Sequence, residues 1–161
     1  MDDNLFLAWA AGFFDGEGSV IVELSKEKDC VHGYRTSLHA NVTQTSLPCL
    51  QLFMERFGGS ITTSENRTPN GRRWSVQYRW VVRNENAAAF LRLIAPYVIV
   101  KKEQVDVALQ YPMVNAEGKK YGGRHNPIPD EVMQARLSVR TLLQNIRASM
   151  KTPAKEARHG E

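Results

Sequence analysis

The sequence has few cysteines and no long apolar run, and each shortage excludes a class of protein. Cys30 and Cys49 are its only two cysteines, too few for a disulfide framework or, by themselves, for a zinc site. No apolar run approaches the roughly 20 residues that span a bilayer. The chain opens with two acids, Asp2 and Asp3, rather than the basic patch of a signal or transit peptide. We therefore expect an intracellular protein with no membrane partner.

Glycine and proline are also too scarce for a collagen-like or low-complexity chain, with 11 Gly and 7 Pro in 161 residues. An apolar fraction of 42% is typical of a globular protein, and the length favours one domain. We expect that domain to cover residues 1–150. The polar segment 151–161 is expected to form a C-terminal tail.

The net charge of +4 is distributed unevenly along the chain. Residues 1–59 hold 4 Lys and Arg against 8 Asp and Glu, whereas residues 60–100 hold 6 against 2 and residues 101–161 hold 11 against 7. All six basic residues of the middle stretch are arginines, whose planar forks suit phosphates and guanine edges. This distribution favours an acidic partner such as a nucleic acid, although a mildly basic chain is also common among proteins with other partners.

Apolar periodicity predicts two helix–strand–strand units followed by further helices. Helices are expected over residues 5–14, 48–57, 86–95, 101–111 and 130–150, and strands over 20–24, 34–43, 60–65 and 73–83. This order predicts an α+β fold in which an αββαββα core forms a four-stranded antiparallel sheet, covered by helices on one face, with extra C-terminal helices. Loops are expected over residues 66–71 and 115–129. The apolar stripe of the last helix is expected to hold Val132, Ala135, Val139, Leu142 and Ile146.

The other face of the predicted sheet mixes hydrogen-bonding side chains with arginines. It lacks the Lys/Glu alternation of a merely solvated sheet, although a solvent-facing surface remains the alternative. Side chains of these types can read base edges in a major groove, where each base pair presents a distinct pattern of donors and acceptors. The residues predicted on this face are Ile21, Glu23, Ser25, Arg35, Ser37, His39, Asn41, Thr62, Ser64, Arg73, Ser75, Gln77 and Arg79.

Residues 8–19 contain a helix face made of small residues and, at the end of that helix, a carboxylate. Ala8, Gly12 and Gly16 recur every four positions, and once Gly16 ends the helix Glu17 can project beyond it. A carboxylate at a helix C-terminus opposes the helix dipole unless a cation offsets it. A divalent cation would do so, and the carbonyl of Gly16 adds a second oxygen ligand suited to Mg²⁺. A tight helix–strand turn with ordinary surface charge is the alternative interpretation.

The nine residues Ala10 to Gly18 resemble the LAGLIDADG motif, with Glu17 at the position where Asp is commoner. The order of elements is also similar to that of the LAGLIDADG homing endonuclease family, so the resemblance covers roughly residues 5–111. Some members of this family assist intron splicing as maturases. The resemblance implies a saddle-shaped sheet that lies in the major groove of DNA, and motif helices that pack at a two-fold axis.

The resemblance also implies roles for single residues. By position in the motif, Glu17 and the carbonyl of Gly16 correspond to ligands of Mg²⁺. Gln44 and Lys101 become the polar residues that order water near the scissile phosphate, with Lys102 in place of Lys101 if the register slips by one. Two residues, Ser19 and Arg72, join the DNA-reading set. The implied dimer interface consists of Ala8, Ala11, Gly12, Asp15 and Gly16.

The chain has one copy of the motif and therefore one Glu17, whereas cutting both strands of DNA needs two such carboxylates. We expect a C2 homodimer that hydrolyses double-stranded DNA with Mg²⁺ at a pseudo-palindromic site of about 20 bp. Two alternatives stay open. One is an RNA-binding intron maturase, and the other is a protein that uses its sheet to bind DNA without cutting it.

Overall fold

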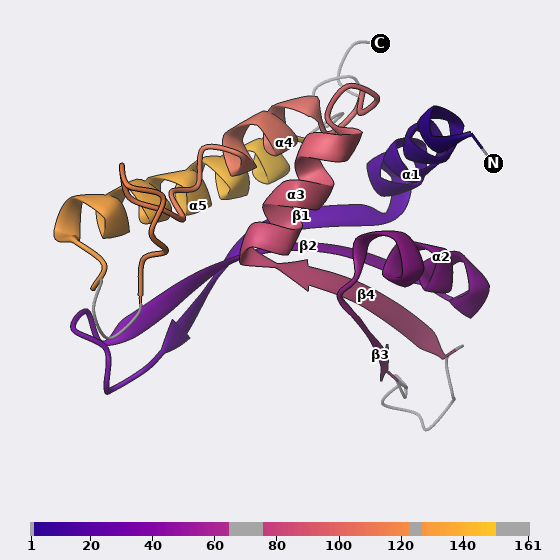
Figure 1. Ribbon diagram of the computed structural model, residues 1–161. Coiled ribbons are helices and arrows are strands. Elements are labelled where there is room, and N and C mark those ends of the chain that lie inside the picture. The colour runs from indigo at the N-terminus through magenta and orange to yellow at the C-terminus, as the bar shows by residue number, and fades with distance from the viewer. Residues whose placement is uncertain (1, 65–75, 123–126, 151–161) are drawn as a thin grey trace, which may run out of the picture.

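The computed structural model describes residues 2–64, 76–122 and 127–150 (Figure 1). Its elements are α1 (Asp3–Glu17), β1 (Gly18–Lys26), β2 (Tyr34–Gln44), α2 (Leu47–Phe57), β3 (Ser60–Ser64), β4 (Gln77–Arg83), α3 (Asn84–Ile94), α4 (Lys102–Ala108) and α5 (Asp130–Met150). The first seven form the predicted αββαββα core, and α4 and α5 are the extra C-terminal helices, so the predicted α+β fold is confirmed. The expected loop 66–71 and tail 151–161 lie outside the described residues.

The four strands form one antiparallel sheet in the order β1-β2-β4-β3. One row of paired residues crosses all four strands, from Gly18 through Val42 and Trp80 to Ile61. The β1–β2 and β3–β4 hairpins descend on opposite sides of the sheet, so its underside is concave (Figure 1).

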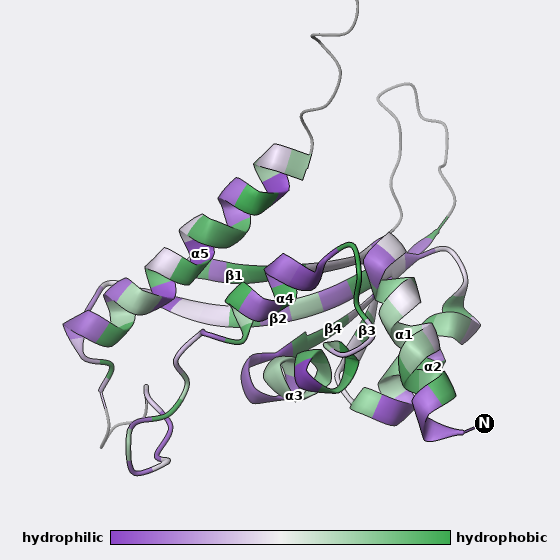
Figure 2. Cartoon of the chain, turned by 90° about the horizontal axis from the view of Figure 1, so that it is seen from above, coloured by the Kyte–Doolittle hydropathy of each residue, from purple (hydrophilic) through white to green (hydrophobic). Residues whose placement is uncertain are grey.

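All helices lie above this arch, where α5 runs over β1 and α3 packs on β2 and β4 (Figures 1 and 2). The core between the layers is rich in aromatic side chains. The Trp80 ring is fully buried, with its centroid 5.0 Å from those of Phe53 and Phe90. Its indole N–H donates to the Gly58 carbonyl at 2.8 Å, which satisfies the one polar group that this ring brings into the core. None of the helices in the described ranges is long and apolar enough to cross a membrane.

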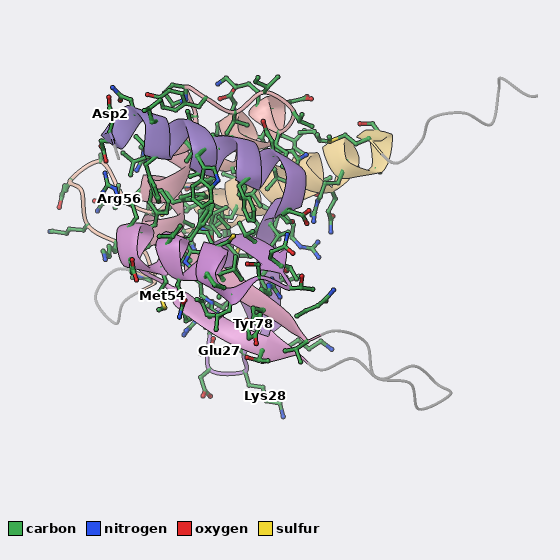
Figure 3. All side chains as sticks on the ribbon, turned by 90° about the vertical axis from the view of Figure 1, so that its right-hand side faces the viewer. Asp2, Glu27, Lys28, Met54, Arg56 and Tyr78 are labelled. Carbon is green, nitrogen blue, oxygen red and sulfur yellow. The ribbon has the colours of Figure 1, made fainter. Side chains whose placement is uncertain are left out.

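Helix α1 has three faces with different surroundings. A bulky face of Phe6, Trp9 and Phe13 packs on α2, with the Trp9 and Phe13 centroids 5.5 and 5.8 Å from that of Phe53. Figure 3 shows side chains filling the space between these two helices, and Arg56 on α2 pairs with Asp3 of α1 at 2.7 Å. The second face is buried in the core and holds Leu7, Ala10, Ala11 and Phe14. The third is open and holds Leu5, Ala8, Gly12 and Gly16.

Gly18 is required by the close approach of the Phe14 ring. A Cβ atom at Gly18 would lie 2.2 Å from Phe14 Cδ2 and 2.5 Å from the Phe14 carbonyl oxygen. Gly18→Ala is therefore expected to lower the free energy of unfolding by about 1–3 kcal/mol, because a fully buried ring must move. Urea unfolding of the two proteins measures this, with Ser25→Ala, at an exposed position of the same strand, as control. Equal losses for both variants would contradict this account.

Several details of the helices differ from prediction. Helix α1 runs from Asp3 to Glu17 and so includes Gly16, which was expected to end it, and α4 ends at Ala108 rather than at residue 111. Helix α3 begins at Asn84 rather than at residue 86, and Asn84 has a φ of +49°. Its side-chain oxygen accepts hydrogen bonds from the Leu38 N–H at 3.2 Å and the Ser37 hydroxyl at 3.0 Å, completing β2 where β4 has ended. In α5, the predicted stripe residues Ala135 and Leu142 are exposed. Val139 is buried as predicted, and the other buried residues of α5 are Met133, Arg136 and Leu143.

Candidate active site and DNA-reading face

The candidate metal ligands lie where α1 passes into β1. Glu17 ends the helix and Gly18 begins the strand, with the Gly18 N–H donating to the Phe14 carbonyl. The Glu17 side chain is exposed and makes no hydrogen bond or ion pair with any other described residue. The Gly16 carbonyl has no helical donor, because the residue four positions on already belongs to β1. Two hard oxygen donors are therefore available at this helix end.

The carboxylate of Asp15 holds the connection between α3 and α4 against the last turn of α1. One oxygen accepts hydrogen bonds from the N–H groups of Ile99 at 2.7 Å and Val100 at 3.1 Å, and the other accepts from the N–H of Lys101 at 2.9 Å. The Lys101 ammonium donates to the Asp15 backbone carbonyl. One acidic residue thus makes four polar contacts with three consecutive residues from a distant part of the sequence.

Lys101, rather than its neighbour, faces the end of α1. Burial lowers the pKa of Lys101 below its usual value, and the negative charges of Asp15 and Glu17 oppose that shift. The Lys102 ammonium instead pairs with Asp106 one helical turn along α4, at 2.6 Å. Of the two lysines considered from the sequence, Lys101 is therefore the one whose charge interacts with the end of α1 and with Glu17.

Gln44 ends β2 on the same side of the molecule. Gly18 pairs with Val42, so Gln44 lies two residues beyond the start of β1, level with the end of α1. Its side-chain oxygen accepts from the backbone N–H and the hydroxyl of Thr45, at 2.7 and 3.2 Å. The fold thus brings Glu17, Gln44 and Lys101 to one end of α1, although they come from three separate parts of the sequence.

The donor set of one chain suits a hard cation but is incomplete. A carboxylate and a carbonyl are the oxygen ligands that Mg²⁺ prefers, with water filling further positions. Within residues 2–64, 76–122 and 127–150, no group of three or more His, Cys, Asp or Glu side chains could hold a metal ion. The site fits a divalent ion only if further oxygen ligands come from outside this protomer.

The underside of the sheet presents most of the predicted DNA-reading residues to solvent. Glu23, Ser25, Arg35, Thr62 and Arg79 are exposed, and Ser19, Ile21, Ser37 and Gln77 are half-buried. Arg35 is held by Glu27, which accepts from two guanidinium nitrogens at 2.8 Å each. The predicted residues Arg72, Arg73 and Ser75, and the side chain of Ser64, lie outside what the structure describes.

Two members of that set, His39 and Asn41, are buried, so the prediction that they are exposed is wrong. Their exposed fractions are 5% and 7%. Both lie on β2, which β1 and β4 flank on either side, so each has a paired residue on both neighbouring strands: Ile21 and Arg83 for His39, Ser19 and Val81 for Asn41. His39 Nε2 lies 3.2 Å from the Glu23 carboxylate. Burial lowers the pKa of His39, with Glu23 opposing the shift and Arg83 and Arg79 adding to it.

The predicted dimer residues divide between the open and the buried faces of α1. Ala8, Gly12 and Gly16 are exposed and Asp15 is half-buried, but Ala11 is fully buried in its own protomer. Because Ala11 has no exposed surface, it is not available to a second chain, and its assignment to the interface is wrong. Small residues line both the open and the buried faces of this helix, so the sequence alone does not separate them.

Sequence reasoning missed three exposed aliphatic side chains, of which Leu5 lies on the open face of α1 and the other two lie in the segment after α3. Leu5 is 64% exposed, and Ile99 and Val100, which Asp15 holds beside α1, are 82% and 60% exposed. The available signal was the aliphatic run 98–100 between two helices, where a solvated loop would have polar residues.

The chain is similar in fold to solved homing endonucleases. The structure of I-CvuI with its target in the presence of 2 mM Ca has a TM-score of 0.62 and 21% identity, over 92% of this chain and 94% of that one. For the archaeal intron-encoded I-Vdi141I complexed with DNA the values are 0.64 and 22%, over 99% and 91%. For I-SmaMI bound to cleaved DNA they are 0.56 and 17%, over 95% of this chain but 51% of that one.

No curated protein matches the chain. The family model described as LAGLIDADG endonuclease matches residues 10–110, a stretch that begins at the motif in α1 and ends just beyond α4. The chain, with its single copy of the motif, belongs to the LAGLIDADG endonuclease family.

Proposed function

We propose that this chain is a homodimeric, Mg²⁺-dependent, site-specific endonuclease that cuts both strands of DNA within a long pseudo-palindromic site. The observation that carries the proposal is the position of Glu17. Its exposed carboxylate makes no hydrogen bond or ion pair with another described residue, and it lies at the end of the helix whose open face holds Ala8, Gly12 and Gly16. Two chains packed on that face would bring two Glu17 carboxylates close to one axis.

The glycines of α1 support this assembly. A glycine inside a helix costs about 1 kcal/mol relative to alanine, so it persists where a side chain would obstruct something. No atom of the protomer lies within 4 Å of a Cβ built at Gly12 or at Gly16. A side chain at either position would therefore obstruct only a partner outside the protomer. The exposed Leu5, Ile99 and Val100 would supply apolar area around the close helix contact.

The residues around Glu17 have the chemistry that phosphodiester hydrolysis needs. Glu17 and the Gly16 carbonyl would hold the metal ion, which when bound activates water and stabilises the leaving oxygen. Lys101 supplies a positive charge that can offset the negative charge developing on the phosphate. Gln44 offers both donors and an acceptor, which can orient a water molecule between protein and DNA.

The underside of the sheet is proposed to read the DNA sequence. Strand β2 has 11 residues, which at about 3.3 Å each span roughly 36 Å. At about 3.4 Å per base pair, one protomer would follow roughly 10 bp and a dimer about 20. The concave shape fits a duplex, and its exposed side chains have the hydrogen-bonding groups that discriminate base edges. The DNA complexes of the structurally similar I-CvuI and I-Vdi141I agree with such a partner.

Arg79→Ala is expected to weaken specific binding by about 1–3 kcal/mol and to relax base preference at one symmetric pair of positions. Arg79 is exposed in the centre of the underside, paired with Thr43 and Thr62 of the neighbouring strands, where its fork can reach a guanine edge. Binding titrations on the preferred site and its single-base variants measure this effect. An equal loss on every sequence would place Arg79 on a phosphate instead.

The proposed function is tested by selection followed by cleavage. The protein is incubated in EDTA with duplexes carrying a randomised segment of about 24 bp, and bound molecules are enriched and sequenced. A pseudo-palindrome is expected, and plasmid carrying it should be linearised on addition of Mg²⁺ but not in EDTA. Binding without cleavage would instead indicate a non-cleaving DNA-binding protein. Preference for structured RNA over every duplex would indicate a maturase.

A further inference from the structure

Asp15 is the polar centre of the joint between the motif helix and the segment that carries Lys101. Its carboxylate accepts three backbone hydrogen bonds, of 2.7, 3.1 and 2.9 Å, from residues 99, 100 and 101. A carboxylate with three amide donors is held firmly, because charge-assisted hydrogen bonds are the stronger kind. These donors also offset the unfavourable position of a negative charge in the last turn of a helix.

The arrangement fixes Lys101 at both ends. The backbone N–H of Lys101 is bound by the Asp15 carboxylate, and its ammonium donates to the Asp15 backbone carbonyl. Both acceptors are groups of Asp15, which directly precedes Gly16 and lies two positions before Glu17. Lys102, which has no such anchor, turns to Asp106 on its own helix. The lysine that faces the candidate metal ligands is therefore selected by contacts with Asp15.

We propose that Asp15 is a positioning residue for the reaction. It places the Lys101 ammonium beside the end of α1 where the phosphate is cut, and it acts through Lys101 without binding metal or DNA itself. This inference rests on the proposed function, and it adds a role that membership of the interface alone would not give Asp15. Both carboxylate oxygens are already engaged within the protomer, which leaves Glu17 as the acid of this pair available to a metal ion.

The test is a double-mutant cycle on single-turnover cleavage of the selected site. Lys101→Met is expected to slow cleavage by about 10²-fold, as loss of one charged donor near a reacting phosphate does. Asp15→Asn is expected to slow it by about 10- to 100-fold, the usual effect of removing a group that orients a functional residue. The double variant should be no slower than Lys101→Met within a factor of about two, because both changes remove one contribution.

Asp106→Asn is the matched control, since it removes the same charge next to Lys102. It should leave the rate unchanged. Two further measurements separate the possible causes of a loss. Hydrogen exchange at residues 99–101 should accelerate in Asp15→Asn, and the mass in solution should stay that of the wild type. If Asp15→Asn does not fold, Asp15→Ser, which keeps one oxygen acceptor, takes its place.

Several outcomes would overturn the role of Asp15. Losses that multiply in the double variant would indicate a merely structural residue, and unchanged exchange at residues 99–101 would show that Asp15 does not hold the segment. A monomeric Asp15→Asn protein would assign Asp15 to the dimer interface instead. By contrast, a wild-type protein that leaves its selected site uncut refutes the proposed function, and the positioning role for cleavage is refuted with it.

Discussion

Replacing Glu17 with glutamine is expected to abolish DNA cleavage while leaving binding of the site intact. The change keeps the shape of the side chain and removes the charge that would hold a divalent ion. Loss of a metal ligand removes several kcal/mol of transition-state stabilisation, so the single-turnover rate should fall by about 10³-fold or more. Affinity measured in EDTA should be unchanged or slightly higher, because a negative charge near the phosphates has gone.

Although Glu17→Gln should lose cleavage, it is not expected to lose stability. Glu17 is at the C-terminus of α1, where a negative charge opposes the helix dipole by about 0.3–1 kcal/mol. Thermal unfolding of Glu17→Gln should therefore occur at the wild-type temperature or slightly above it. Glu55→Gln, the same change at an exposed position on α2, serves as control and should retain full cleavage. A Glu17→Gln protein that still cuts would exclude Glu17 as a metal ligand.

Gly12→Leu is expected to convert a dimer into a monomer and so to eliminate double-strand cleavage. Within the protomer the new side chain meets nothing at its Cβ position, and leucine favours a helix by roughly 0.5–1 kcal/mol over glycine. The chain should therefore remain folded. Between protomers, a leucine on the small-residue face would prevent the two helices from approaching closely. Light scattering should give twice 18.2 kDa for the wild type and 18.2 kDa for the variant.

Ala135→Leu is the control for that experiment, because Ala135 is an exposed small residue on α5, away from α1. It should stay dimeric and active. Circular dichroism on both variants checks that the fold is kept. A wild-type protein with the mass of one chain at the concentrations that cut DNA, or a dimeric Gly12→Leu protein, would refute an interface on this face.

Helix α1 shows which packing faces can be predicted from the residue types and which cannot. Its aromatic residues Phe6, Trp9 and Phe13 recur at helical spacing, and they form the bulky face that packs on α2. The small residues were harder to place, because small side chains suit a tight core and a tight helix contact equally well. Ala11 is in the core and Gly12, its neighbour in sequence, is open. Only the position of α3 and the sheet decides between them.

The contacts of Asp15 could not be predicted, because they join residues more than 80 positions apart through backbone N–H groups, which every sequence has. Arg136 was unpredictable for a related reason. Its Nε donates to the Pro112 carbonyl at 2.9 Å and its guanidinium lies 4.8 Å from the centre of the Tyr111 ring, so a charged residue occupies the buried stripe of α5. Periodicity assigns such a position to an apolar residue.

In the proposed dimer, two copies of Glu17, one from each protomer, form one cutting site. The most direct test is to map the cut positions on both strands of the selected site at single-nucleotide resolution, with Mg²⁺ and with EDTA. We expect one cut in each strand, placed symmetrically about the centre of the pseudo-palindrome, with Mg²⁺ only. Cuts confined to one strand, cuts without symmetry or cuts that persist in EDTA would contradict it.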